Sequence, residues 1–325
     1  MYTTEEKYLF KIINTYKMKI LITGGAGFIG SNLTKRLVED GHEVVVLDNL
    51  LRGNKIDRHT FTKINFTKGD VRDFNLVNKV VKGCDVIFHF AAVLGVDVVA
   101  DHPVETMDVE VIGTRNVVQA AEINNVDKIL YASTSGIYSH SAIESALKEE
   151  VLVDPRTSYA MAKRYNEIYL ASHHEEKGLN AISLRFFNVY GENQDNRMVI
   201  PRFFEQAMEN KNITVFGDGN QTRDFTYIDD TIEACVRLIE IDGYHIINIA
   251  NETEWNIKHI AETIKEITHS SSEIAYIGAP KKRYDYEVER RVGNSDKLVR
   301  LINYKPKTTI KEGLKIIYDL KYKEK

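Results

Sequence analysis

The sequence has only two cysteines, Cys84 and Cys235, and no CxxC or metal-ligand pattern surrounds either of them. So few cysteines argue against a disulfide-stapled secreted domain and against a cysteine-ligated metal centre. We expect both to be reduced core residues of a cytoplasmic protein, and we expect no metal site.

Long apolar runs are also missing. No run approaches the roughly 18 residues that a membrane span needs. Residues 1–17 are charged throughout and lack the apolar centre of a signal peptide. Because the chain from Met18 looks like a natural beginning, we interpret residues 1–17 as an N-terminal extension without a catalytic role. It is either a short appended helix or a start site placed too far upstream.

The chain also has no large excess of charge of either sign. The net charge of −4 gives no electrostatic reason to expect nucleic acid or an anionic membrane as a partner. The chain shows no repeats and no low-complexity tracts. Its 43% hydrophobic and 28% charged residues are typical of a soluble globular protein. A chain of 325 residues holds one large α/β domain or two ordinary ones.

Short apolar runs alternate with helical patterns in the first part of the chain. The runs rich in Val, Ile and Phe are residues 19–24, 43–48, 64–70, 85–92 and 128–134, and helical spacing covers 30–41, 74–83 and 111–124. Strands that alternate with helices favour a parallel sheet with helices on both faces and right-handed crossovers. We therefore predict an α/β fold with a Rossmann-type, doubly wound parallel sheet.

The amino-acid composition changes after Gly191, where the chain becomes polar and rich in turn-forming residues. Residues 245–251 then look like a strand that returns to the sheet, and the last segment is interpreted as loop, helix and helix. We predict a Rossmann domain over 18–191 with strand 245–251, and a smaller interleaved domain over 192–244 and 252–325. Ligand is expected in the crevice at the carboxyl ends of the strands.

A glycine-rich segment, ITGGAGFIGSNL, joins the first predicted strand to the first helix. Gly24, Gly27 and Gly30 give a tight turn, close approach of the backbone to a pyrophosphate, and close packing of helix on strand. The helix N-terminus then offers free N–H groups to the anion. A plain strand–turn–helix with incidental glycines is the alternative.

Two acidic residues follow the next strands. Asp48 ends the second strand, where a carboxylate can hold an adenosine ribose and repel a 2′-phosphate, so NAD is favoured over NADP. Asp70, after the third strand, offers a carboxylate for the adenine amine. The alternative for Asp48 is an ordinary exposed acid.

Tyr159 and Lys163 are four residues apart, so they share one face of a predicted helix. A phenol has a pKa of ~10, and a neighbouring ammonium favours its ionised form. Bringing that pKa to about 7 requires roughly 4 kcal/mol of differential interaction. A YxxxK pattern alone is common in helices, where it usually marks two solvated side chains.

Together with these features, further segments carry a resemblance that covers the chain from Met18 onward. They include HFAA (89–92), STSGIY (133–138), YAMAK (159–163), RFFNVYG (185–191), VIPRF (199–203), VFGDGNQTRDFTYIDD (215–230) and RRVGNSDK (290–297). In these the chain resembles the short-chain dehydrogenase/reductase superfamily, and more closely its extended branch, which modifies nucleotide sugars.

The resemblance implies roles for individual residues. Thr134 would hydrogen-bond the reacting sugar oxygen, Tyr159 would be the acid/base, and Lys163 would hold the nicotinamide ribose. The implied NAD-binding residues are Gly24, Gly27, Phe28, Ile29, Gly30, Asp48, Asn49, Asp70, Val71, Ala91, Ala92, Tyr159 and Lys163. The implied nucleotide-sugar-binding residues are Ser135, Asn188, Val199, Arg223, Arg290 and Arg291. The resemblance also implies a homodimer formed through a four-helix interface.

The residues after Thr134 indicate the reaction. Similar 4,6-dehydratases carry STDE and similar decarboxylases carry STSE, whereas this chain has Ser135 and Gly136 and no acid at either position. Elimination needs a further positioned acid and base, so we predict a 4-epimerase with NAD as cofactor. The resemblance favours a UDP-hexose or its N-acetyl or uronic acid form as substrate, and dTDP, GDP and CDP sugars stay open. A dehydratase, a decarboxylase, a 4-keto reductase or a cofactor-binding scaffold without turnover remain alternatives.

Two departures from the family pattern stand out. The family usually has asparagine in NVxGT, whereas VEVIGT places Glu110 there. A carboxylate at this position is expected either to raise the pKa of Tyr159 or to take over a structural hydrogen bond. The loop predicted at 93–103 also lacks the arginine and serine that are common there.

Overall fold

The computed structural model describes residues 17–93, 96–138, 145–278 and 288–323. The predicted N-terminal extension therefore lies outside the described residues, except for Lys17.

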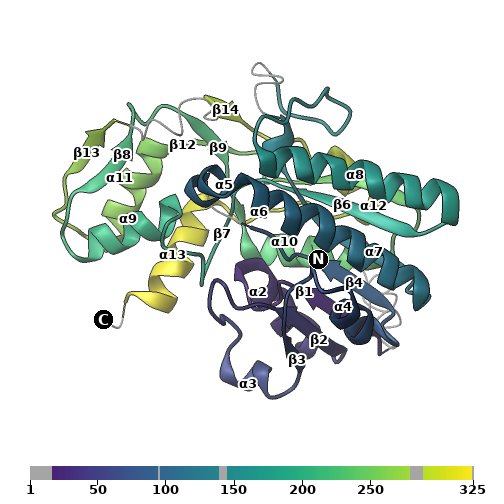
Figure 1. Ribbon diagram of the computed structural model, residues 1–325. Coiled ribbons are helices and arrows are strands. Elements are labelled where there is room, and N and C mark those ends of the chain that lie inside the picture. Colours follow the sequence, from purple (N-terminus) through teal and green to yellow (C-terminus); the bar gives the residue numbers. More distant parts are fainter. Residues whose placement is uncertain (1–16, 94–95, 139–144, 279–287, 324–325) are drawn as a thin grey trace.

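A seven-stranded sheet forms the centre of the molecule (Figure 1). Its order is β3–β2–β1–β4–β5–β6–β11, and every neighbouring pair is parallel. The strands are β1 (Lys19–Thr23), β2 (Glu43–Asp48), β3 (Asn65–Lys68), β4 (Val86–His89), β5 (Lys128–Thr134), β6 (Asn180–Phe186) and β11 (Tyr244–Ile249). The strand order reverses between β1 and β4, so a crevice is expected at their carboxyl ends. The predicted α/β fold class is confirmed.

Alternating side chains of the strands build two separate cores. Ile20 and Ile22 of β1 pack toward one face, and Leu21 packs toward the other. The first face is covered by α2 (Phe28–Glu39), α10 (Ile228–Arg237) and α12 (Asp296–Ile302); the second is covered by α4 (Phe74–Val81), α7 (Gly113–Ile123) and α8 (Ser158–Lys177). Strands buried on both faces explain the near-continuous apolar runs of the sequence.

Short helical segments complete this layer. They are α3 (Arg58–Phe61), α5 (Val96–Asp101), α6 (Pro103–Met107), a π-helical turn η1 (Asp108–Ile112), and two 3₁₀ turns, η2 (Ser135–Tyr138) and η3 (Leu238–Glu240). The prediction of a loop over 93–103 was wrong, because α5 occupies most of this range and α6 begins at its last residue. Helices this short have too few apolar repeats to be recognised from their spacing.

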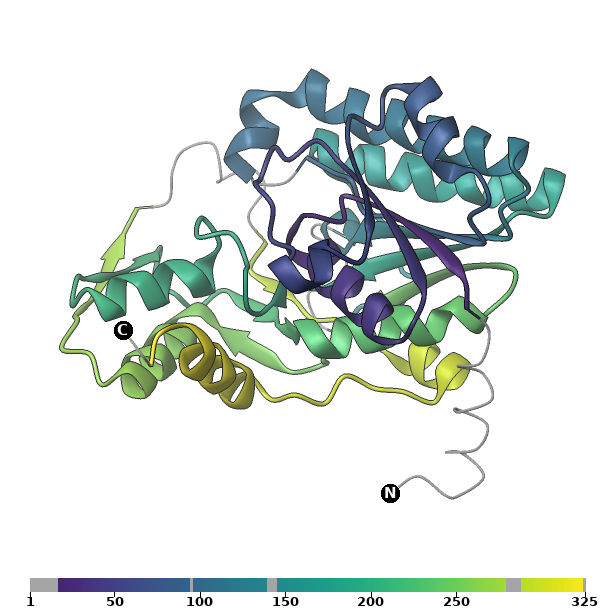
Figure 2. The same cartoon turned by 90° about the horizontal axis from the view of Figure 1, so that it is seen from below.

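A second region lies at the left in Figure 1, beyond the carboxyl ends of the strands. It contains the parallel pair β8 (Ile213–Phe216) and β13 (Ile274–Ile277), with α9 (Val199–Met208), α11 (Ile257–Thr268) and α13 (Ile310–Lys321). Figure 2 shows the yellow C-terminal helix α13 on the side of this region, away from the blue and teal helices of the sheet.

Small strand pairs connect this second region to the sheet. They are β7 (Val189–Tyr190) with β10 (Thr226–Tyr227), and β9 (Thr222–Asp224) between β12 (Glu254–Asn256) and β14 (Arg290–Arg291). The segment after Gly191 is more regular than its polar texture suggested. Buried Ile200, Phe203, Phe204 and Ala207 make α9 amphipathic, and turn residues on both sides hide that pattern in the sequence.

Both cysteines are buried and free, as predicted. Across the described ranges, no helix combines the length and apolarity that crossing a membrane requires. In the same ranges, no three His, Cys, Asp or Glu residues are arranged to hold a metal ion.

Candidate active site

The glycine loop between β1 and α2 is packed so closely that side chains cannot enter it. A Cβ on Gly30 would lie 2.2 Å from the Gly24 carbonyl oxygen, and one on Gly24, whose φ is +71°, would lie 2.7 Å from the Ala91 nitrogen. Gly27 caps α2 and supplies no side-chain hydrogen bond. The first turn of α2, which begins with Phe28, Ile29 and Gly30, therefore presents its free N–H groups beside this glycine loop. Such a glycine cradle is suited to an anion.

Asp48 connects the second strand to this loop. Its Oδ2 accepts from the Ala26 N–H (2.9 Å) and its Oδ1 accepts from the Leu50 N–H (2.7 Å). Burial raises the pKa of the carboxyl, and the two backbone hydrogen bonds oppose that rise. Each oxygen keeps a lone pair for a ligand hydroxyl. The neighbouring Asn49 side chain accepts from the Leu51 N–H (2.9 Å) and shapes the turn.

The ends of β3 and β4 border the same loop. Arg72 holds the Asp70 carboxylate through two guanidinium contacts of 3.0 and 2.6 Å, and this partner lowers the pKa of Asp70. Asp70 is thus already paired, which sequence reasoning did not foresee. Val71 beside it is buried. Ala91 donates its N–H to the Thr23 hydroxyl (3.2 Å), and Ala92 follows it, half-buried.

Thr134 ends β5, and its hydroxyl is oriented from two sides. The Gly136 N–H donates to Thr134 Oγ1 (3.0 Å), and Tyr159 of α8 shares a side-chain hydrogen bond with the same hydroxyl. A Cβ on Gly136 would lie 3.2 Å from Thr134 Oγ1, which is tight. Glycine at position 136 therefore allows its backbone N–H to lie close to the Thr134 hydroxyl. Ser135, between the two, is buried.

Lys163 lies one turn after Tyr159 and is completely buried. Its Nζ lies 2.9 Å from Glu110 Oε2, 5.3 Å from the centre of the Tyr159 ring and 4.7 Å from the centre of the Tyr131 ring. Burial raises the pKa of the Tyr159 phenol, the Glu110 charge raises it further, and the Thr134 hydrogen bond opposes both. The expected effect of Glu110 on Tyr159 is therefore present in the structure.

A buried ion pair supports this arrangement from behind. Arg185 of β6 donates from Nε to Glu167 Oε1 and from Nη2 to Glu167 Oε2, both at 2.8 Å. The Ser133 hydroxyl also donates to Glu167 Oε1 (2.6 Å). Sequence reasoning missed this network, although an arginine inside an otherwise apolar strand was a visible signal that a buried partner exists.

Two of the predicted substrate arginines are neighbours. Arg223 of β9 and Arg291 of β14 are register partners in a parallel pair. Arg290 instead directs its guanidinium to Glu254 of β12, with Nε–Oε1 and Nη2–Oε2 distances of 3.0 Å. The three arginines therefore lie on the two adjacent strands β9 and β14.

The other two predicted substrate residues lie at the junction of the two regions. Asn188 precedes β7, and its carbonyl accepts from the Thr226 N–H (3.2 Å). Val199 is the first residue of α9. Both are half-buried, so their side chains retain accessible surface.

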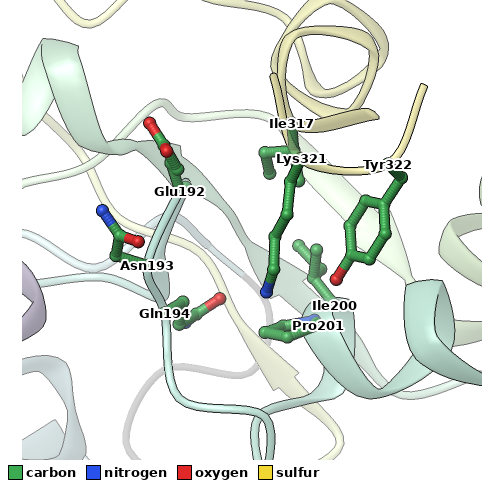
Figure 3. Close-up of a pocket in the computed structure, with 9 residues that line it drawn as sticks. Glu192, Asn193, Gln194, Ile200, Pro201, Ile317, Lys321 and Tyr322 are labelled. Carbon is green, nitrogen blue, oxygen red and sulfur yellow. The ribbon is translucent and has the colours of Figure 1, made fainter. Parts of the chain in front are cut away.

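A small pocket lies elsewhere in this second region (Figure 3). It is lined by residues of the loop after β7, of α9 and of the end of α13, including Gln194, Pro201, Lys321 and Tyr322. Figure 3 shows the Lys321 side chain extending across it toward Gln194 and Pro201. None of its lining residues belongs to the predicted catalytic or cofactor set, so we do not place the chemistry there.

Comparisons with known proteins found similar sequences and similar structures. A model of the NAD dependent epimerase/dehydratase family matches residues 20–250. A UDP-N-acetyl-alpha-D-glucosaminuronate decarboxylase of Bacillus cytotoxicus is 35% identical over 312 residues, which are 92% of this chain and 96% of that protein.

Two solved structures are similar over nearly their whole length. The UDP-glucose 4-epimerase of Thermotoga maritima, determined with UDP-glucose, has a TM-score of 0.87 and 28% identity, with 93% of this chain and 98% of that chain covered. The UDP-N-acetylglucosamine 4-epimerase of Methanobrevibacter ruminantium, in complex with UDP-N-acetylmuramic acid, also has a TM-score of 0.87 and 28% identity, with 94% and 98% covered.

Proposed function

The chain belongs to the NAD dependent epimerase/dehydratase family, and within it we propose that the protein is a nucleotide-sugar 4-epimerase. The proposal rests on Gly136, whose N–H binds Thr134 Oγ1 at the position where similar dehydratases and decarboxylases carry an acid. A site with a hydroxyl, a phenol and an ammonium suits removal and return of hydrogen at one carbon. It offers no second acid and base at 135–136 for elimination.

The cofactor of the family is NAD, and the residues of the chain fit it. The glycine cradle, which Cβ atoms would fill, and the α2 N-terminus provide an anion site for a pyrophosphate. We propose that Asp48 binds the adenosine ribose and that Lys163 binds the nicotinamide ribose. The Asp48 carboxylate would repel a 2′-phosphate.

NAD bound in this cradle would supply the acceptor for a hydride of the sugar and the donor that returns it. We propose that the Tyr159 oxygen takes the proton of the C4 hydroxyl as the C4–H bond breaks, and gives it back when that bond re-forms. Thr134 Oγ1, held by the Gly136 N–H, orients the same sugar oxygen. The proton therefore passes from the C4 hydroxyl to the Tyr159 phenolate and back, with no net change in either.

Epimerisation also requires the sugar to present its other face between the two transfers. Tight binding of the nucleotide diphosphate permits the sugar to turn, because the hexose itself is then held only by hydrogen bonds at its reacting edge. The neighbouring Arg223 and Arg291 are suited to this binding, since the planar guanidinium binds phosphate with several hydrogen bonds. Ser135, Asn188 and Val199 are proposed to complete the substrate site.

The proposed substrate class is a UDP-hexose: UDP-glucose and UDP-galactose, their N-acetyl forms, or their uronic acids. The names of the similar proteins support UDP and leave the sugar open, because they include glucose, N-acetylglucosamine and a glucosaminuronate.

The deciding experiment follows a panel of UDP-sugars by proton NMR with purified protein and no added cofactor. We expect one C4 pair to interconvert while total sugar stays constant. Release of CO₂ from a uronic acid would favour the decarboxylase alternative, which the 35% identity to a UDP-sugar decarboxylase supports. A 4-keto product, or no change until NAD(P)H is added, would point to a dehydratase or a reductase.

Replacing Arg291 by alanine is expected to raise the KM for the UDP-sugar about 10- to 100-fold, because a charge-assisted hydrogen bond contributes roughly 1.5–3 kcal/mol. Its effect on kcat should be small, since the diphosphate does not react. Arg300→Ala, at an exposed position near the end of α12, is the matched control. Steady-state kinetics of both variants test this, and equal KM values would contradict the choice of Arg291.

We further propose that the chain forms a homodimer. Met161, Tyr165 and Ile168 share one face of α8 and are 49%, 45% and 52% exposed, and Ile112, the last residue of η1, is 42% exposed. Apolar side chains exposed together on a helix face favour burial against a second copy. Sedimentation of the protein and of Ile168→Glu should show a dimer and a monomer; a monomeric parent would contradict the proposal.

The division into a Rossmann domain (18–191 with 245–251) and a nucleotide-sugar-binding domain (192–244 and 252–325) is proposed on the same grounds. Arg223, Arg291 and Val199 lie in the second part, and the glycine loop lies in the first. The buried free cysteines support a cytoplasmic location.

A further inference from the structure

The most unusual feature of the site is a carboxylate that touches the catalytic lysine. Glu110 and Lys163 are both completely buried, and 2.9 Å separates Glu110 Oε2 from Lys163 Nζ. Within the described parts of the chain, neither atom has another hydrogen-bond partner. A buried charge without a partner is strongly unfavourable, so the positions of these two side chains depend on each other.

The backbone holds Glu110 in place independently of this contact. Glu110 lies in the π-helical turn η1, directly before α7. Its carbonyl accepts from Asn166 Nδ2 (3.0 Å), and its Oε1 accepts from the Val93 N–H (3.3 Å). The Gly113 N–H at the end of the π-turn also reaches the Glu110 carbonyl oxygen, so this backbone is held both within its own turn and by Asn166 of α8. The carboxylate is therefore fixed against the face of α8 that carries Lys163.

This placement changes the charge that Tyr159 experiences. A lone ammonium near a phenol favours the phenolate, and an adjacent carboxylate removes most of that effect. Burial is the larger reason that the pKa of Tyr159 is raised, and Glu110 adds to it. Burial also raises the pKa of Glu110 itself, against the pull of Lys163.

We propose that Glu110 is a positioning residue of the reaction: its carboxylate holds the Lys163 ammonium in place and offsets the positive charge that would otherwise favour the Tyr159 phenolate. The asparagine usual at this position would leave the lysine charge uncompensated. The role in turnover rests on the proposed epimerase function, whereas the effect on Tyr159 is measurable without it.

Other ionisable groups around this cluster do not account for the effect. From β4, His89 is buried between the Thr23 and Thr114 hydroxyls, and burial lowers its pKa to about 3, so it stays neutral. From β5, Tyr131 is buried, and burial followed by Glu110 raises its pKa well above its ordinary value. From α8, Glu167 is paired with Arg185 of β6.

The test uses protein whose tyrosines are replaced by 3,5-difluorotyrosine, a phenol that ionises at lower pH, and follows its ionisation by ¹⁹F NMR as pH rises. The Tyr159 resonance, one of 17, is identified by its loss in Tyr159→Phe. In Glu110→Gln and Glu110→Asn we expect its midpoint to fall by about 1–2 pH units, the effect of one unit charge at short range in a protein. Glu105→Gln, an exposed residue of α6, is the charge-matched control and should leave the midpoint in place.

A merely structural role would lower stability without moving this midpoint. A Tyr159 resonance that stays phenolic over the same pH range in both Glu110 variants as in the parent would overturn the proposal. If no UDP-sugar is turned over, the titration still decides the role of Glu110, so the two proposals fail separately. With turnover, the acidic limb of the pH profile of kcat should move to lower pH by the same amount.

Discussion

Tyr159→Phe is expected to lower kcat for epimerisation by a factor on the order of 10²–10⁴, the usual contribution of a positioned acid/base. The substitution removes the oxygen that shares a hydrogen bond with Thr134 and leaves the ring, which stays beside Lys163. Because the helix and the glycine cradle are unchanged, the variant should fold and keep its NAD. Steady-state rates and the retained cofactor, read by absorbance after denaturation, give the two measurements.

The matched control for this variant is Tyr276→Phe. Tyr276 lies on β13 and is 48% exposed, so removal of its hydroxyl should change kcat by less than twofold. Turnover by Tyr159→Phe at a near-parental rate would show that another group moves the proton. Loss of turnover together with loss of NAD would show instead that Tyr159 acts through cofactor binding.

Much of the fold can be predicted from the sequence, because the residues of both cores form regular hydrophobic patterns along it. The inner strands β1, β2 and β4 are buried on both faces, so each is a compact apolar run, and the glycine loop follows the first of them because only glycine fits there. The α/β prediction follows from these patterns, whereas the roles of Thr134, Tyr159 and Lys163 came from resemblance and remain predictions.

The features that sequence reasoning missed depend on contacts between distant segments. The register of β14 against β9 brings Arg223 beside Arg291 and leaves Arg290 to Glu254, and no local pattern encodes that register. The pairing of Asp70 with Arg72 is local but has no periodic signal. Glu110 stood out as a departure, but its contact with Lys163 depends on the π-turn that directs it toward α8.

The largest expected loss of stability follows Glu167→Gln. Glu167 is completely buried and carries the charge that balances Arg185 of β6, which is 1% exposed. Glutamine keeps the shape but leaves the guanidinium without a countercharge. Breaking a buried pair on one side costs about 3–5 kcal/mol. The midpoint of thermal unfolding should fall on the order of 10 °C.

Glu175→Gln on the exposed end of α8 is the control, and it should change stability by less than about 0.5 kcal/mol. A double-mutant cycle with Arg185→Met separates the pair from its surroundings: if the ion pair is responsible, the two losses should not add. An equal fall in the midpoint of thermal unfolding for Glu167→Gln and Glu175→Gln would show that the Glu167–Arg185 ion pair does not stabilise the fold.

The same variant connects stability to the site. Glu167 lies four residues after Lys163 on α8 and accepts from Ser133, the residue before Thr134. Loosening this contact releases the end of β5 from α8, so the Thr134 and Tyr159 oxygens should lose their fixed separation. We therefore expect kcat of Glu167→Gln to fall at temperatures where the variant is still folded, which loss of folded protein alone would not produce.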